Sequence, residues 1–167
     1  MVETARDDKK EGLSLISETI CGTGIRISEL QNITVESLLS GYASVSCKGK
    51  ERIILIPVKL KEKLREYCFK HEIQSGSIFI TRSGKPIDRS NVWTEMNKLC
   101  EKANISHGKV FPHNMRHLFA RTYYGKQKDI VHLADILGHS SIETTRIYTM
   151  TSSFEYERQL EEMDLII

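Results

Sequence analysis

The sequence predicts a single α+β domain that is mainly helical and contains one small antiparallel β-sheet. Most apolar residues recur every three or four positions, as they do on one face of a helix. Only one pair of short β-rich runs flanks a polar turn in the pattern of a β-hairpin. The length of 167 residues, with 40% hydrophobic and 28% charged residues, is that of one globular domain with a buried core.

The first half of the chain divides into helix, hairpin and helix. Helical spacing over residues 11–21 stops at Gly22-Thr23-Gly24, and a short helix is expected at 27–30. Residues 42–47 and 52–57 are rich in β-forming side chains and flank Lys48-Gly49-Lys50-Glu51, which predicts a hairpin with Lys48 at or beside its turn. Residues 58–70 have the spacing of a helix.

The second half is expected to be almost entirely helical. A short strand at 77–81 and a turn at 82–86 come first. Asp88 or Ser90 is suited to cap the next helix, and Ser140-Ser141-Ile142-Glu143 has the spacing of a capping box. Helices are therefore expected at 88–103, 113–124 and 128–136, and from Ser140 onward.

Charge and cysteine usage limit the classes of function. The net charge is +2, and the segment 151–167 carries five acidic side chains against one arginine, so the body of the chain is moderately basic and permits a polyanionic partner. The cysteines stand singly, as expected for reduced thiols in the cytoplasm; they are Cys21, Cys47, Cys68 and Cys100. No apolar run approaches the ~18 residues that cross a bilayer, which argues against a membrane protein.

The segment Pro112-His113-Asn114-Met115-Arg116-His117 carries candidate chemistry. His113 and Arg116 are three positions apart and project from one face of a helix, where a guanidinium fork can bind phosphate oxygens and an imidazole can exchange a proton. His117, four positions after His113, also fits a two-histidine metal site, but no carboxylate ligand accompanies it. The other interpretation is that His117 is a buried structural residue.

A second candidate segment is Leu137-Gly138-His139, followed nine positions later by Tyr148. Gly138 is suited to end a helix in a left-handed conformation, which would place His139 in a loop. In one continuous helix, nine residues put His139 and Tyr148 on opposite faces. The two side chains can therefore meet only if a new helix begins between them. In the isolated domain, Tyr148 is expected to lie away from its partners.

Upstream, Arg26 follows Gly22-Thr23-Gly24-Ile25, and Lys48 lies in the predicted hairpin. Taken in order, these residues and the two later segments resemble the tyrosine recombinases, or phage integrase family. The resemblance runs from about Ser14 to Tyr148. The matching segments are 23–30, 48–52, 112–117 and Leu137-Gly138-His139-Ser140-Ser141-Ile142-Glu143-Thr144-Thr145-Arg146-Ile147-Tyr148.

The resemblance implies the catalytic-domain fold of these recombinases and a role for each of six residues. Tyr148 would attack a DNA phosphodiester, form a 3′-phosphotyrosyl intermediate and release a 5′-hydroxyl. Lys48 would protonate the leaving oxygen; the turn is one residue shorter than the usual pattern, so Lys50 is the second candidate. The other implied roles are phosphate binding by Arg26 and Arg116, proton exchange with the tyrosine by His113, and a hydrogen bond to the phosphate from His139.

The resemblance also implies cofactors, partners and domain organisation. The reaction would need no metal and no ATP, would act on double-stranded DNA within a homotetramer, and would take place in the cytoplasm. A monomer is the alternative for this chain by itself. Residues 1–150 would form the catalytic domain, incomplete at its N-terminus and without a preceding core-binding domain. Residues 151–167 would form a C-terminal tail helix, packed on its own domain or on a neighbouring protomer.

The function favoured by the sequence is strand cleavage and rejoining by an integrase or transposase of a bacterial mobile element. Three alternatives remain: a chromosome-resolving recombinase of the Xer type, a catalytically silent DNA-binding module, and a histidine-ligated metal hydrolase. The filled catalytic positions argue against the silent module, and the missing carboxylate ligands argue against the hydrolase.

Overall fold

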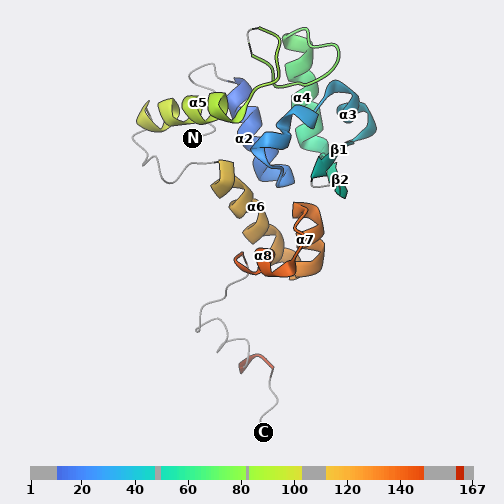
Figure 1. The fold of residues 1–167 in the computed structure, drawn as a ribbon, viewed down its shortest axis with the longest axis vertical. Helices are drawn as coiled ribbons and strands as arrows, with labels where there is room; N and C mark the ends of the chain where they lie inside the picture. Colours follow the sequence, from blue (N-terminus) through green and yellow to red (C-terminus); the bar gives the residue numbers. More distant parts are fainter. Residues whose placement is uncertain (1–10, 48–49, 82, 103–111, 149–160, 164–167) are drawn as a thin grey trace.

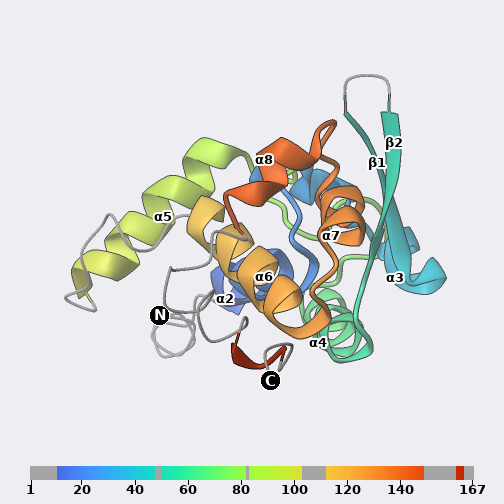
Figure 2. The same cartoon turned by 90° about the horizontal axis from the view of Figure 1, so that it is seen from below.

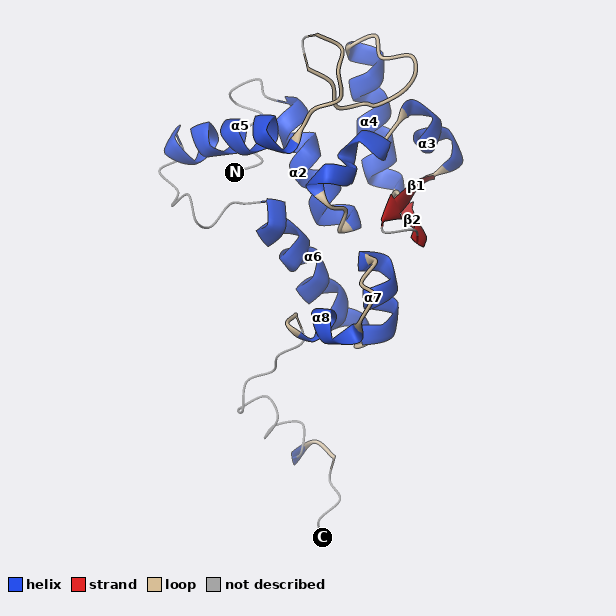
Figure 3. Ribbon diagram, viewed as in Figure 1, coloured by secondary structure: helices blue, strands red, loops and turns tan. Residues whose placement is uncertain are grey.

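The computed structural model describes residues 11–47, 50–81, 83–102, 112–148 and 161–163. Helices dominate this part of the chain, and the one sheet has two strands (Figure 3). In chain order the elements are α2 (Glu11–Thr23), the 3-10 helix η1 (Ile27–Asn32), α3 (Val35–Ser40), β1 (Tyr42–Cys47), β2 (Lys50–Leu55), α4 (Val58–Lys70), α5 (Arg89–Lys102), α6 (Pro112–Gln127), α7 (Ile130–Leu137) and α8 (Ile142–Arg146). This confirms the predicted fold class.

The helices form two groups that meet at the start of α6. Elements α2 to α5 enclose the larger hydrophobic core, in which Ile20, Leu30 and Leu64 are fully buried. A smaller cluster, which contains Leu133, Leu137 and Tyr148, lies among α6, α7 and α8. Figure 1 shows α6 leading from the first group into the second. Residues at this junction can therefore draw on both halves of the chain.

The helix α2 ends where the chain has to turn toward the site. Gly24 follows it with a φ of 66°, a left-handed conformation that glycine adopts without steric cost. A side chain at this position would also collide with the ring of Phe119, since an added Cβ would lie 2.5 Å from its Cδ1. The tight turn lets η1 begin at Ile27 and leaves Arg26 at its N-cap.

The β-hairpin is confirmed, but its second strand is shifted from the predicted 52–57. It spans Lys50–Leu55, and Lys50 pairs with Cys47. Polar side chains suggested that Lys50 belonged to the turn, but pairing is made by backbone groups and continues regardless of them. The strand ends early because Pro57 already occupies the N-cap position of α4. Lys48 lies outside the described residues. Figure 2 shows the hairpin beside α7.

The predicted strand at 77–81 is wrong. This segment makes only isolated bridges, between Thr34 and Ser77 and between Ile80 and Pro86. It turns back on itself through the hydrogen bond from Gly84 N to the Thr81 carbonyl, which confirms a turn in this region. The segment therefore bonds mainly to its own continuation.

The predicted start of α5 is confirmed. The Asp88 carboxylate accepts a hydrogen bond from Asn91 N at 2.8 Å and caps α5, as predicted.

Cys68 and Cys100 are buried and Cys21 is half-buried, all three as free thiols. None of the helices in the described ranges combines the length and the apolar character needed to cross a membrane. Most of the predicted tail helix lies outside those ranges.

Candidate active site

Arg116 lies in the interior at the junction of the two helix groups. Only 4% of its surface is exposed. Its guanidinium donates to the carbonyl oxygen of Gly24, beyond the end of α2, and to that of Leu137 at 2.5 Å. The position of this arginine is therefore fixed by two segments far apart in the sequence.

Three consecutive carbonyl groups at the C-terminus of α7 each accept a hydrogen bond from a different arginine. The last carbonyls of a helix have no partner within it and carry partial negative charge, so they suit cations. Three guanidiniums are thus gathered at one helix end. The donor and acceptor pairs are Arg52 with Ile136, Arg116 with Leu137, and Arg26 with Gly138.

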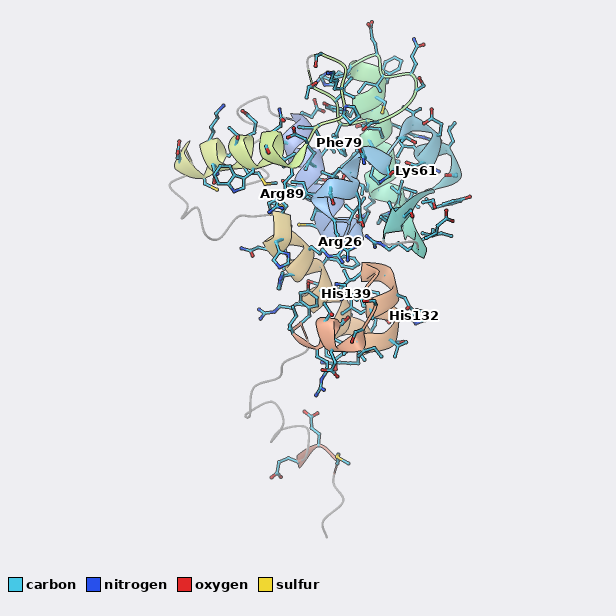
Figure 4. The ribbon with its side chains drawn as sticks, viewed as in Figure 1. Arg26, Lys61, Phe79, Arg89, His132 and His139 are labelled. Carbon is cyan, nitrogen blue, oxygen red and sulfur yellow. The ribbon has the colours of Figure 1, made fainter. Side chains whose placement is uncertain are left out.

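Crowding of positive charge is visible in the pKa of Arg116. Burial, and then repulsion from Arg26 and Arg52, lowers this pKa to about 10. The group is still protonated at neutral pH. Figure 4 shows Arg26 close to His139 where the two groups of helices meet. The cluster is therefore a preformed cationic site, as required for binding a phosphate.

Glu29 neutralises part of this charge and was not identified from the sequence. Its carboxylate is paired with Arg26 at 3.0 Å and also with Arg52, and it accepts from Arg26 N at 2.9 Å. Glu29 lies in the first turn of η1 and is only 8% exposed, although its side chain is acidic. Its spacing of three residues from Arg26 was the available signal, because such pairs face each other on a helical turn.

Arg52 is the second residue that sequence reasoning missed. It lies on the face of β2 that carries the buried Ile54, and it pairs with the buried Val45 of β1. Since alternate residues of a strand point to opposite faces, this register sends its side chain inward. An arginine in phase with a buried strand face was the signal that could have identified it.

Gly138 ends α7 as predicted, with a φ of 64°. A Cβ at this position would lie 2.5 Å from Cδ of Arg52 and 2.8 Å from its Nε. The glycine therefore does two things at once. It allows the left-handed turn that places His139 outside the helix, and it leaves room for the Arg52 side chain.

His139 has both ring nitrogens engaged. A guanidinium can only donate, so Nε2 accepts from Arg116 at 3.3 Å, and Nδ1 carries the proton and donates to the buried hydroxyl of Thr145 at 2.8 Å. Burial, followed by repulsion from Arg116 and Arg26, lowers the pKa of His139 to about 4. The imidazole is therefore neutral at physiological pH.

Tyr148 follows a new helix, as the nine-residue gap requires. The cap of α8 is Ser141, whose hydroxyl accepts from Glu143 N at 3.2 Å, and not the predicted Ser140. The chain remains extended through Ser141, so the helix begins one residue later. Tyr148 lies in the turn just after α8, and its backbone N donates to the Thr145 carbonyl at 3.0 Å.

The expectation that Tyr148 lies away from its partners is wrong. Its ring centroid is 4.5 Å from that of His117, edge to face, and 6.1 Å from that of His139, in a stacked arrangement. Tyr148 is 6% exposed because it packs into the small cluster with Leu133 and Leu137. Packing of the ring is sufficient to hold the tyrosine beside the histidines.

His117 is half-buried, so the prediction of a buried residue is wrong. Its Nε2 lies 2.7 Å from Nε2 of His113, close enough for one imidazole to donate to the other. Burial, and then the charges of His113 and Arg121, lowers the pKa of His117. His117 thus connects His113 to Tyr148, with which it shares an edge-to-face contact.

Of the six candidate residues, five lie in this cluster and Lys48 lies outside the described residues. Among the residues that are described, no group of three or more His, Cys, Asp or Glu side chains could hold a metal ion. The chemical resources of the site are therefore a phenol hydroxyl, imidazoles and guanidiniums. They could bind a phosphate and deliver an oxygen nucleophile to it.

Comparison with known proteins agrees with this geometry. The model of the phage integrase family matches residues 2–154. The tyrosine recombinase XerD of Staphylococcus saprophyticus subsp. saprophyticus is 32% identical over 154 residues, which cover 87% of this chain and 52% of that protein. The tyrosine recombinase XerA of Pyrococcus furiosus is 31% identical over 159 residues, 91% of this chain and 54% of that protein. The chain spans about half the length of these relatives.

Two solved structures show the same fold. The crystal structure of XerA recombinase has a TM-score of 0.78 at 26% identity, covering 99% of this chain and 61% of that one. The Tn1549 transposon integrase in complex with transposon right end DNA has a TM-score of 0.70 at 20% identity, covering 92% of this chain and 59% of that one. The fold is that of the tyrosine recombinase catalytic domain, and the chain belongs to the phage integrase family.

Proposed function

We propose that this chain cleaves and rejoins DNA strands at specific sites through a 3′-phosphotyrosyl intermediate. The observation that carries the proposal is the position of Tyr148, whose ring lies near those of His117 and His139, the second of which is hydrogen-bonded to the buried Arg116. A hydroxyl nucleophile beside fixed guanidiniums is the arrangement that phosphoryl transfer needs. Family membership supports the same reaction.

In the proposed reaction, the Tyr148 oxygen attacks the phosphorus and the 5′-oxygen of the broken strand leaves. Arg26 and Arg116 bind the non-bridging oxygens and offset the charge that develops on them. His139 is neutral, carries its proton on Nδ1, and keeps Arg116 oriented through Nε2. In our proposal a ring rotation or tautomer change would then let it donate to the phosphate.

Proton transfer is assigned to two further residues. His113 receives the phenol proton of Tyr148. His117 contacts both residues, so it offers a route for that proton from Tyr148 to His113. Lys48 protonates the leaving 5′-oxygen, with Lys50 as the second candidate. A bridging 5′-phosphorothioate tests this choice, because sulfur leaves without a proton and should rescue only the variant that lacks the acid.

The test of the reaction is covalent capture of DNA. The chain is incubated with a pool of nicked duplexes of randomised sequence, in which the fragment released by cleavage diffuses away and prevents rejoining. We expect DNA–protein adducts that survive detergent, and none from Tyr148→Phe. Tyr123→Phe, on α6, is the matched control and should still form them. Adducts from Tyr148→Phe would disprove the assignment of the nucleophile.

The same capture separates this reaction from that of a metal hydrolase. Guanidiniums supply the positive charge, and the covalent intermediate conserves the energy of the broken bond, so neither metal nor ATP is needed. Adduct formation should therefore continue in excess chelator. Loss of cleavage with chelator, restored by zinc, would instead favour the hydrolase. DNA binding without any adduct would favour a silent DNA-binding module.

We further propose that the chain acts as the integrase or transposase of a bacterial mobile element. The fold of the Tn1549 transposon integrase supports this role. A chromosome-resolving recombinase of the Xer type is the second candidate, supported by the XerD and XerA relatives. The captured sequences distinguish the two. Ends of an element that encodes this chain favour the integrase, whereas one fixed chromosomal locus favours the Xer role.

The assembly and its location complete the proposal. Double-stranded DNA is the partner, as in the structure of XerH bound to its difH substrate. The active form is a homotetramer on DNA in the cytoplasm, with residues 151–167 as a tail helix of the catalytic domain 1–150. Mass measurement of the DNA complex tests the tetramer: a complex that stays monomeric at saturating protein would exclude it.

A further inference from the structure

We propose that Arg52 is a positioning residue that holds Arg26, through Glu29, in the orientation that meets the phosphate. The inference rests on the proposed function, because it assigns a role within the same reaction. Arg52 belongs to the same group of arginines at the end of α7 as Arg26 and Arg116, but its side chain is buried. It acts from β2 on a neighbouring element, which carries Arg26 at its N-cap.

The contacts of Arg52 are those of a buried connector. Its side chain and that of Glu29 are each 9% exposed, and they form a direct ion pair. The other arm of the guanidinium donates to the Ile136 carbonyl at the end of α7. The Arg52 side chain thus connects the hairpin to η1 and to α7.

Charge balance explains why Glu29 needs a second cation. A carboxylate paired with Arg26 alone would neutralise the charge that Arg26 has to present to a phosphate. With Arg52 on the same carboxylate, the group of three keeps a net positive charge. Arg26 is 31% exposed at its side chain, so its remaining face is accessible to a ligand while Arg52 stays inside.

Geometry leads to the same conclusion. Arg26 donates to the Gly138 carbonyl at 3.3 Å, and the Arg52 side chain packs against the α-carbon of that same residue. The loop that holds Arg26 from one side is therefore supported by Arg52 from the other. Without Arg52, Glu29 would lose the partner that fixes its position, and the loop at Gly138 would lose its support. The geometry of both contacts that orient Arg26 would therefore loosen.

The activity test uses a substrate in which a methyl group replaces one non-bridging oxygen of the scissile phosphate. This methylphosphonate is neutral, so it depends less on a guanidinium partner. Arg52→Met should slow adduct formation about tenfold on the normal phosphate, as expected for a weakened charge-assisted contact. The defect should shrink on the methylphosphonate, as it should for Arg26→Ala. Arg65→Met, at an exposed position on α4, is the control and should match the unchanged chain.

A second measurement tests the inference without DNA or catalysis. In the folded, isotope-labelled chain, NMR relaxation of the Arg26 Nε–H group should show a restrained side chain, and Arg52→Met should make it mobile. An Arg26 that stays restrained, or an equal fold loss on both substrates with a lowered unfolding midpoint, would overturn the inference and leave Arg52 a structural residue. If the unchanged chain forms no adduct at all, the proposed function fails, and the NMR result still decides the role of Arg52.

Discussion

The surroundings of His139 control its protonation. Its Nε2 must stay unprotonated to accept from Arg116, and three nearby guanidiniums oppose a positive charge on the ring. A neutral imidazole is thus built into the site. The cationic cluster has this effect before any phosphate is bound. A bound phosphate dianion or diester would reverse it, since negative charge favours the protonated form.

This control predicts a pH dependence of stability. The pKa of His139 is about 4 in the folded chain and 6.5 when unfolded, so the unfolded state binds more protons between these values. The contribution of His139 is present above pH 6.5 and is lost as the pH falls toward 4. Between pH 7 and pH 5, the free energy of unfolding should fall by about 1 kcal/mol more than in His139→Gln, after allowance for partial exposure. Urea unfolding at both pH values measures this, and equal losses would contradict it.

Gly138 should be far less replaceable than another glycine with the same backbone conformation. Gly138→Ala adds a Cβ that collides with Arg52 and also incurs the cost of a positive φ, so we expect a loss of about 2–3 kcal/mol in the free energy of unfolding. Gly84→Ala is the matched control, because Gly84 has a φ of 77° and open space around it. It should lose only about 1 kcal/mol. Equal losses would show that the Arg52 contact is unimportant.

At the scale of elements, α8 shows how a very short helix can serve a site. It has five residues, too few to be stable alone. It nevertheless connects the loop that holds His139 to the turn that holds Tyr148. The hydroxyl cap from Ser141 and the packing of the Tyr148 ring stabilise this helix, because its intrinsic helix propensity is too small to do so. The helix is therefore a spacer, and its start determines where the nucleophile falls.

The cap of α8 can be tested by a pair of neighbouring serines. Ser141→Ala removes the acceptor of Glu143 N and should cost about 0.5–1 kcal/mol, whereas Ser140→Ala should cost almost nothing. The free energy of unfolding from urea titration distinguishes them. Adduct formation should slow in Ser141→Ala only, since Tyr148 would lose its support. A larger effect at Ser140 would restore the cap that the sequence predicted.

Elements were predictable where local signals were complete. The bounds of α4 were predicted in full, because an apolar stripe begins there directly after a proline. The start of β2 was not, since Lys50 and Glu51 gave a turn-like composition to residues that pair through their backbones. The false strand at 77–81 failed for the opposite reason. Its side chains suit a sheet, but no strand in the described part of the chain offers it a continuous edge.

At the scale of the whole molecule, Arg116 joins the two helix groups as well as belonging to the site. It satisfies a carbonyl at the end of α2 and another at the end of α7, which belong to different hydrophobic clusters. Arg116→Ala should therefore lower the free energy of unfolding by about 2–4 kcal/mol, because two buried carbonyls lose their donor. Arg26→Ala, at a half-exposed position, should cost about 1 kcal/mol or less. Chemical unfolding measures both, and equal losses would refute the joining role.

The site as a whole could be predicted from the sequence only in its list of chemical groups. Arg26, Arg116, His139 and Tyr148 were recognisable because each stands in a segment with its own signature. Glu29 and Arg52 were not recognised, since their importance comes from contacts with one another across 23 positions. Long-range pairing of this kind is decided by how the elements pack, and the local pattern around each residue carries only a weak trace of it.

The three arginines held by successive carbonyls have a consequence for how the chain tolerates changes in length. Each residue added to a helix rotates everything after it by about 100° and moves it by about 1.5 Å. A single insertion or deletion within 136–138 would displace the carbonyls that follow it, so at least one arginine would lose its acceptor, whichever amino acid was involved. A Cβ added at Gly84 would meet nothing within 4 Å, so the turn at Gly84 should accept an extra residue. The spacing of that short stretch is thus as much a part of the site as the side chains it holds.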